Sequence, residues 1–218
     1  MYVPLFVIMI NLVWSQITIS EVMFDLDGVD SPNEFIELYN FSDENIPFQN
    51  WLIADKFSTD EITPDGFTIF PANQFAVILE GDYDGFYDAF FPADVLLIYV
   101  DDLSIGNGLG NSADSLFLIN KSGLIISEMG WNSTIEPGYS LEKIVLDFDN
   151  TEYNWRQSLD SLGTPGKVNS VASFTVDVGI DSIYVDLISI APFQEFDLFI
   201  NLKNKGILMA SSQVFINS

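Results

Sequence analysis

The stretch Glu34-Phe35-Ile36-Glu37-Leu38-Tyr39-Asn40 carries the strongest structural signal in the chain. Glu34 and Glu37 stand among apolar residues, a composition typical of a strand that is buried on at least one face. Their two carboxylates are therefore expected to point toward solvent or to lie at the rim of a sheet. Short apolar runs of this kind recur between turn signals along the chain, which favours strands over helices.

The first 150 residues contain about nine such runs, a number typical of a β-sandwich. The segments expected to form strands are 17–24, 35–39, the run that begins at Trp51, 67–70, 74–80, 95–100, 114–120, 124–129 and 139–146. The segments 114–120 and 124–129 are predicted to pair as a hairpin, because Gly123 supplies the positive φ that a tight turn needs. The spacing of the runs therefore predicts an all-β fold.

Three further motifs follow the first one in order: Asn50-Trp51, Tyr139-Ser140-Leu141-Glu142 and Gly163-Thr164-Pro165-Gly166. Together with Trp155, this ordered set resembles the lamin tail domain as it occurs in secreted bacterial proteins. Where the family has a Gly-Trp pair this chain has Asn-Trp, and Asn also tolerates left-handed backbone angles. The resemblance implies an immunoglobulin-like β-sandwich that generally lacks catalysis of its own.

The resemblance covers residues 17–171, which are expected to form the main domain. Trp51 and Trp155 are expected to anchor its core, since each indole can bury roughly 200 Å². Residues 158–173 are rich in Ser, Gly, Pro and Asn and are interpreted as the exit from the domain. The Pro165-Gly166 pair is expected to form a turn that ends the sheet.

Two segments lie outside that domain. Residues 1–16 are apolar and are interpreted as a signal peptide with cleavage near Ser15 or Gln16, which predicts a secreted or cell-surface protein. Residues 172–218 carry alternating segments at 175–184, 196–202 and 213–217. They resemble the opening half of an Ig-like (CARDB-like) adhesion module of bacterial cell-surface proteins, and they are expected to form an incomplete second Ig-like β domain.

The composition restricts the classes of partner and chemistry. The net charge is -25, from 32 acidic and 7 basic residues, so binding to nucleic acid or to anionic membranes is disfavoured. The chain has no Cys and no His, which excludes thiolate or imidazole zinc sites and Ser-His-Asp triads. No run outside the predicted signal peptide approaches the roughly 18 apolar residues of a membrane span, so none is expected in the mature chain.

One acidic loop has a pattern that could bind a metal ion. Asp25, Asp27, Asp30 and Glu34 place oxygen ligands at alternating positions, as a hard cation such as Ca²⁺ prefers. The spacing is not that of the twelve-residue EF-hand loop, so a solvated acidic loop is the alternative. No cofactor other than this calcium is expected.

Other segments are interpreted in structural terms. The glycine-rich residues 106–111 lack the Lys-Ser/Thr of a phosphate-binding loop and are predicted to form a flexible connection. Lys121, Lys143 and Lys167 adjoin turns or strand ends and are expected to be exposed. In the aromatic stretch 83–91, Phe86, Phe90 and Phe91 are expected to fill one end of the sandwich; exposed, they could stack on sugars or dock a protein.

The function favoured by the sequence is a non-catalytic, exported structural or binding module of a cell-surface or secreted bacterial protein, with a protein or cell-surface partner. Two alternatives stay open. The chain could be the accessory domain of a larger secreted hydrolase, such as a nuclease, phosphoesterase or peptidase. It could also be a calcium-dependent adhesion module.

Overall fold

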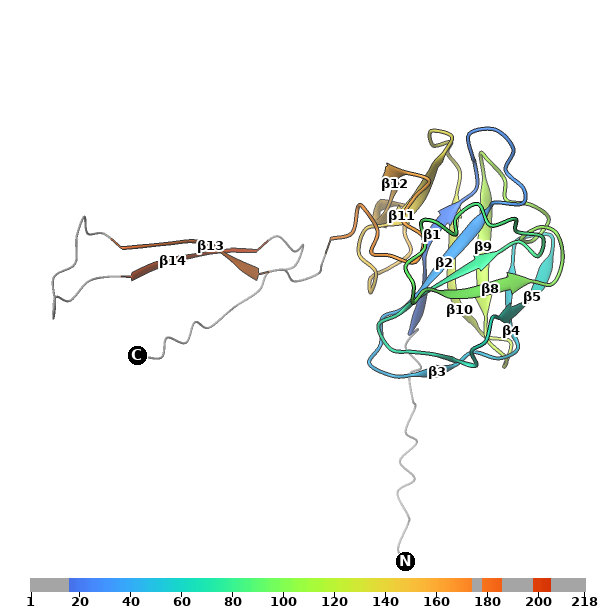
Figure 1. Ribbon diagram of the computed structural model, residues 1–218, viewed down its shortest axis with the longest axis horizontal. Helices are drawn as coiled ribbons and strands as arrows, with labels where there is room; N and C mark the ends of the chain where they lie inside the picture. Colours follow the sequence, from blue (N-terminus) through green and yellow to red (C-terminus); the bar gives the residue numbers. More distant parts are fainter. Residues whose placement is uncertain (1–15, 174–177, 186–197, 205–218) are drawn as a thin grey trace, which may run out of the picture.

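The computed structural model of the protein describes residues 16–173, 178–185 and 198–204 (Figure 1). These residues form β-strands and one short 3₁₀ helix, η1 (Glu152–Asn154). The strands in chain order are β1 (Ile17–Met23), β2 (Phe35–Asn40), β3 (Ile46–Pro47), β4 (Trp51–Ala54), β5 (Thr59–Pro64), β6 (Ile69–Phe70), β7 (Phe75–Leu79), β8 (Leu96–Val100), β9 (Asp114–Ile119), β10 (Ile125–Trp131), β11 (Tyr139–Lys143), β12 (Trp155–Ser161), β13 (Val178–Val185) and β14 (Leu198–Asn204). The all-β class predicted from the sequence is confirmed.

Ten of the strands share one hydrogen-bonded sheet in the order β10-β9-β4-β5-β8-β7-β2-β1-β11-β12. Neighbours are antiparallel except β7 and β8, which run parallel. The sheet folds over on itself, so that its edge strand β10 meets β1, where the Ile19 amide donates a hydrogen bond of 3.0 Å to Ser127 Oγ. The two resulting layers face each other as in an immunoglobulin-like sandwich (Figure 1).

The main hydrophobic core lies between the layers and contains the three indoles of Trp51, Trp131 and Trp155. Trp51 and Trp155 are both buried, as the sequence predicted. Phe24 stacks on Trp131 with 4.6 Å between ring centroids. Aromatic rings of this size contribute most of the apolar area that stabilises a small sandwich.

The turns follow the residue types that the sequence offers. The β9–β10 hairpin is present with Gly123 at φ 78°, and Asn50 takes the left-handed backbone at φ 56°, both as predicted. The Pro165-Gly166 turn is closed by a hydrogen bond of 2.9 Å from the Lys167 amide to the Thr164 carbonyl.

Three strands were not predicted: the two-residue strand β3, and the longer strands β5 and β12. The β5 segment contains Asp60 and Pro64, and the first part of the predicted domain exit, residues 158–161, belongs to β12. Both segments are polar and give no clear apolar alternation. They are extended because neighbouring strands pair with them, as Tyr139 of β11 does with Ser161. The interpretation of residues 158–161 as part of the exit from the domain was therefore wrong.

The strands β13 and β14 form a separate antiparallel hairpin, in which Tyr184 stacks on Phe199 at 5.0 Å. They overlap the predicted segments 175–184 and 196–202, while the predicted strand 213–217 and residues 1–15 of the predicted signal peptide lie outside the described residues. The likeness to a CARDB-like module stays a prediction. Among the residues that the structure describes, no helix has the length and hydropathy that crossing a bilayer requires.

Candidate functional site

Three glutamates stand side by side across neighbouring strands of the sheet. Glu21 of β1 lies opposite Glu37 of β2 on one side and opposite Glu142 of β11 on the other. All three side chains are 0% exposed. We call them the glutamate row. The expectation that Glu37 faces solvent or a rim was wrong, and so was the same expectation for Glu34, which is also buried.

The glutamate row binds residues 163–171, which we call the closing segment. Each glutamate accepts a hydrogen bond from one serine hydroxyl and another from one backbone N–H of the closing segment. The bonds run from Ser140 Oγ (2.5 Å) and Thr164 N (2.8 Å) to Glu21, from Ser20 Oγ (2.7 Å) and Gly166 N (2.7 Å) to Glu37, and from Ser170 Oγ (2.7 Å) and Val171 N (3.0 Å) to Glu142. The Thr164 hydroxyl also lies between Glu21 and Glu142.

The row concentrates acidic groups at a fully buried site. Burial, and then the neighbouring Glu142, raises the pKa of Glu21 to about 8. Burial and then Glu21 likewise raise the pKa of the Glu37 carboxyl well above its usual range. Like charges directly opposite each other destabilise a sheet, so the serine hydroxyls and the amides of the closing segment are needed to offset the repulsion.

This network explains why the sequence motifs occur together. The first motif supplies Glu37, the Tyr-Ser-Leu-Glu motif supplies Ser140 and Glu142, and the Gly-Thr-Pro-Gly motif supplies the donors. Gly166 and Glu37 are 129 positions apart in the chain. Three short patterns that look independent in the sequence therefore form one hydrogen-bonded unit.

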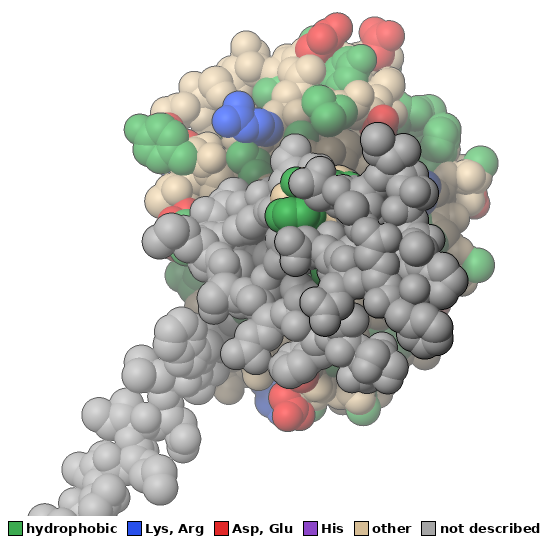
Figure 2. All heavy atoms as spheres, turned by 90° about the vertical axis from the view of Figure 1, so that its left-hand side faces the viewer, with side chains coloured by type: hydrophobic (Ala, Val, Ile, Leu, Met, Phe, Trp, Pro, Cys, Tyr) green, Lys and Arg blue, Asp and Glu red, His purple; other side chains and the backbone are tan. Residues whose placement is uncertain are grey.

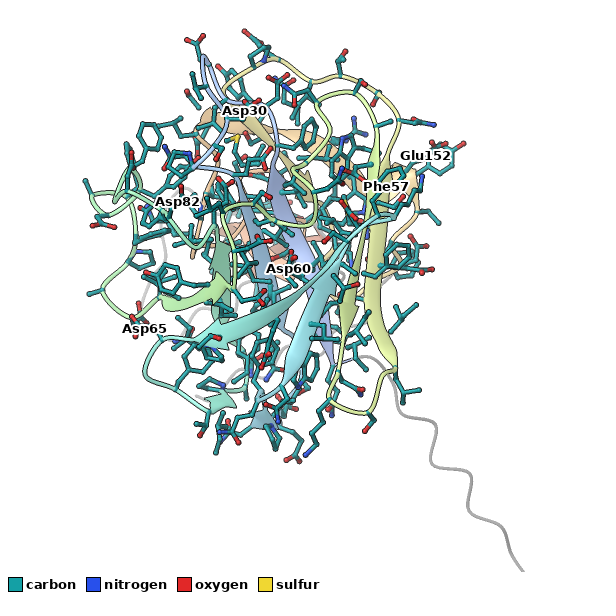
Figure 3. The ribbon with its side chains drawn as sticks, turned by 90° about the vertical axis from the view of Figure 1, so that its right-hand side faces the viewer. Asp30, Phe57, Asp60, Asp65, Asp82 and Glu152 are labelled. Atoms are coloured by element: carbon teal, nitrogen blue, oxygen red, sulfur yellow. The ribbon has the colours of Figure 1, made fainter. Side chains whose placement is uncertain are left out.

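Carboxylates also bind the glycine loop. Its amides donate to four acidic side chains: Gly106 to Asp60 (2.5 Å), Asn107 to Asp55 (2.9 Å), Leu109 to Glu34 (3.1 Å) and Gly110 to Asp114 (3.1 Å). Figure 3 shows Asp60 lying over the sheet, whereas Asp65 and Asp82 lie at the periphery. The prediction of a flexible connection was wrong, because four carboxylates hold residues 106–110 in place.

The residues of the predicted calcium site lie around this loop. Asp25 and Asp30 both accept hydrogen bonds from the Asn111 amide, at 3.1 and 3.2 Å. Glu34 is bound to Leu109, and burial raises its pKa to about 8. Asp27 is exposed. In the described part of the chain no three metal-binding side chains are grouped to hold a metal ion. Calcium binding stays a prediction, which a calorimetric titration would check.

Glu80 is a buried acid that the sequence did not single out. Its Oε2 accepts the Glu34 amide at 3.1 Å, whereas its Oε1 and the nearby Asn33 Oδ1 are buried without a hydrogen-bond partner. Burial raises the pKa of Glu80 to about 7. The only signal was its position at the end of an apolar run, where a charged residue is normally expected to mark the strand end.

Lys143 is buried, contrary to the prediction that it is exposed. Its ammonium donates to Thr18 Oγ1 at 2.8 Å and to the carbonyls of Leu146 and Phe148 at 3.2 and 2.9 Å. Three acceptors satisfy its three donors, while burial lowers its pKa to about 8. The lysine orders the turn that follows β11, a structural role.

The aromatic stretch 83–91 is arranged differently from the prediction. Tyr87 is the buried ring; its hydroxyl donates to the Asn33 carbonyl at 3.0 Å and its edge contacts Phe35. Phe86 and Phe90 are 43% and 46% exposed, so they do not fill the end of the sandwich. Residues 87–91 form one helical turn, closed by the Phe91 amide and the Tyr87 carbonyl, which directs Tyr87 inward.

A polar groove of about 380 Å³ lies on the surface near η1. Its walls include Lys56, Trp131, Glu152 and Trp155. Phe57 and Tyr153, which directly follow the two charged residues, are 80% and 84% exposed. Figure 3 shows Phe57 and Glu152 on the same part of the surface. This groove, which we call the η1 groove, has opposite charges in its walls; the two exposed rings do not line it but stand next in sequence to two of its wall residues.

The face shown in Figure 2 carries hydrophobic side chains interspersed with acidic ones and few basic ones. This pattern matches the composition of the whole chain, with its net charge of -25. A surface of this kind favours partners that are neutral or basic where they touch it.

Comparison with known proteins agrees with this architecture. The family model described as the lamin tail domain matches residues 14–133, more than half of the chain. No curated protein matches. The matched residues include Glu21 and Glu37 of the glutamate row and the buried Trp51. Glu142, in the same sheet, and the closing segment that binds it lie after the matched residues. The chain therefore belongs to the lamin tail domain family.

Proposed function

We propose that this chain is a non-catalytic, exported module of a secreted or cell-surface bacterial protein, and that it binds a protein or cell-surface partner. The immunoglobulin-like fold of the family generally serves binding or structural roles. The apolar residues 1–16 support export. The buried carboxylates hold loops of the fold, as Glu142 and Asp60 do, which is a structural use of acidic residues.

The observation that carries the binding role is the pair of exposed rings at the η1 groove. Phe57 and Tyr153 expose most of their surface to water, which is unfavourable for large rings unless a partner covers them. Lys56 and Glu152 add a cation and an anion that can orient a polar partner. Aromatic residues beside polar groups are the usual centre of a protein interface.

The binding role predicts a loss of affinity when the rings are removed. The full chain with Phe57→Ala and Tyr153→Ala should bind purified bacterial cell envelopes at least about tenfold more weakly than the unchanged chain, since interface aromatics commonly contribute 2 kcal/mol or more. Binding of fluorescently labelled protein in a sedimentation assay measures this. Leu103→Ala is the matched control, because Leu103 is also exposed but neither lines the groove nor adjoins in sequence a residue that does. Equal binding of all three proteins would refute the role of the groove.

The export role predicts that residues 1–16 direct the chain across a membrane. We expect a fusion of the full chain to a phosphatase that is active only outside the cytoplasm to be active, and the same fusion without residues 1–16 to be inactive. Both fusions should be present in equal amounts on an immunoblot. If the shortened fusion is active, residues 1–16 are not the segment that directs the chain across the membrane. The hydrolase-accessory and calcium-adhesion alternatives stay predictions.

A further inference from the structure

We propose that the glutamate row holds a proton that keeps the closing segment docked on the sheet, and that loss of this proton with rising pH releases the segment. The closing segment would then act as a pH-sensitive latch at the end of the main domain. This inference does not depend on the binding partner or on export.

The geometry around Thr164 requires the proton. Its hydroxyl oxygen lies 3.1 Å from Glu21 Oε2 and 2.9 Å from Glu142 Oε1. A hydroxyl has one hydrogen, so Thr164 can donate to only one of the two carboxyl groups. The other must carry a proton and donate it to the threonine oxygen. With this proton, the hydrogen-bond series from Glu21 through Thr164 to Glu142 is complete. Without it, the threonine oxygen faces an ionised carboxylate oxygen in a buried site with no hydrogen between them.

Most charged groups around the row oppose full ionisation; Arg156 of β12 lies opposite Glu142 in the register, but it is exposed. Glu37 lies on the far side of Glu21, and the Tyr87 ring, from the turn packed against these strands, is near enough to interact with Glu21. Lys143 follows Glu142 on β11, but successive side chains of a strand point to opposite faces, and its ammonium is bound to Thr18. Lys167, in the closing segment itself, is exposed.

The closing segment lies directly against the row. The segment supplies all three backbone donors, from Thr164, Gly166 and Val171, whereas the serines Ser20 and Ser140 belong to the strands. Three ionised carboxylates repel one another strongly at low dielectric. Undocking residues 163–171 exposes them to solvent while the paired strands stay intact, so this segment is the part that moves.

Amide hydrogen exchange on the full chain tests the latch. We expect the protection of the Thr164, Gly166 and Val171 amides, corrected for intrinsic exchange, to fall by about tenfold or more between pH 6 and pH 9. The reason is that each pH unit above the pKa of a carboxyl raises the ratio of its ionised to its protonated form tenfold. Amides of the β9–β10 hairpin are the internal reference. Unchanged protection of the three amides, or a parallel loss in the hairpin, would overturn the proposal.

Glu21→Gln is the decisive variant. Its amide oxygen can accept from Ser140 and from the Thr164 amide, and its NH₂ group can donate to the Thr164 hydroxyl, so it reproduces the protonated carboxyl at every pH. We expect this variant to keep the three amides protected at pH 9. An unchanged pH dependence would overturn the proposal. Asn169→Ala is the control: Asn169 binds the carbonyls of Ser20 and Lys143, so its loss should lower protection at every pH without changing the pH dependence.

A spectroscopic measurement on the unchanged chain tests the same proposal without relying on a variant that folds. In a ¹³C NMR titration of the glutamate side-chain carboxyl carbons, we expect at least one carboxyl of the row to remain protonated at pH 7. If Glu21, Glu37 and Glu142 all show the chemical shift of an ionised carboxylate at pH 7, the proposal is overturned.

Discussion

The free energy of unfolding of this chain is expected to fall steadily as the pH rises from about 5 to about 8. Burial raises the pKa of Glu21 and Glu34 to about 8, that of Glu80 to about 7 and that of Asp60 to about 6. In this pH range the folded chain binds protons that the unfolded chain has already lost. Folding is therefore linked to proton uptake, and stability decreases as protons are removed.

The size of the effect is large for one domain. A carboxyl that titrates near pH 8 in the folded chain and near its usual value in the unfolded chain loses on the order of 4 kcal/mol across that range. Lys143 does not cancel this loss. Its pKa is lowered to about 8, so its unfavourable contribution is constant below that pH and is relieved only above it.

Urea unfolding at several pH values between 5 and 8 measures the profile. Glu21→Gln should reduce the slope of the profile, since the amide cannot ionise while Glu34, Glu80 and Asp60 still contribute, whereas Glu61→Gln should leave it unchanged because Glu61 is exposed. A profile that is flat or that rises with pH would contradict the expected protonation of the buried carboxyls.

The second large effect is expected from Gly163→Ala. A methyl group at this position would overlap the Glu21 carboxylate and crowd Ser140 Oγ, and the backbone has a φ of +73°. Gly123→Ala is a matched control, because its φ of +78° is similar but nothing lies within 4 Å of the added carbon. The pair therefore separates backbone strain from displacement of the glutamate row.

Both substitutions should lose about 1 kcal/mol to the left-handed backbone. Gly163→Ala should lose roughly 2–3 kcal/mol more, since a close-packed site relaxes only at the cost of its hydrogen bonds. Thermal and urea unfolding of the two variants at pH 6 compare them directly. Equal destabilisation would mean that the closing segment can shift away from Glu21 without penalty.

The fold followed from local patterns, and the candidate site followed only in part. Alternating apolar residues predicted most strands, and the Gly123 and Asn50 turns needed only the conformational range of those residue types. The burial of Glu21 and Glu37 could not be derived in this way, because a glutamate in a strand is normally placed toward water. The backbone amides that bind these two glutamates come from a segment more than a hundred positions away, and no local pattern indicates them.

The same reason accounts for the wrong expectations about Lys143 and the glycine loop. Lys143 is at the end of a strand, where lysines are usually exposed, and its three acceptors are fixed only once the following turn has folded. The glycine loop looks unrestrained until Asp55 and Asp60 of other segments meet its amides. In both cases tertiary hydrogen bonds override the local tendency.

The position of β1 has a consequence for how the chain reaches its native state. This strand precedes every other described strand in the sequence, yet it lies between β2 and β11, and its Ser20 carbonyl accepts a hydrogen bond from the side chain of Asn169, 149 positions later. Contacts of such long sequence separation slow folding. During synthesis the sheet therefore stays incomplete until nearly all of the domain has been translated, and in that interval its open strand edges are exposed to pairing with other chains.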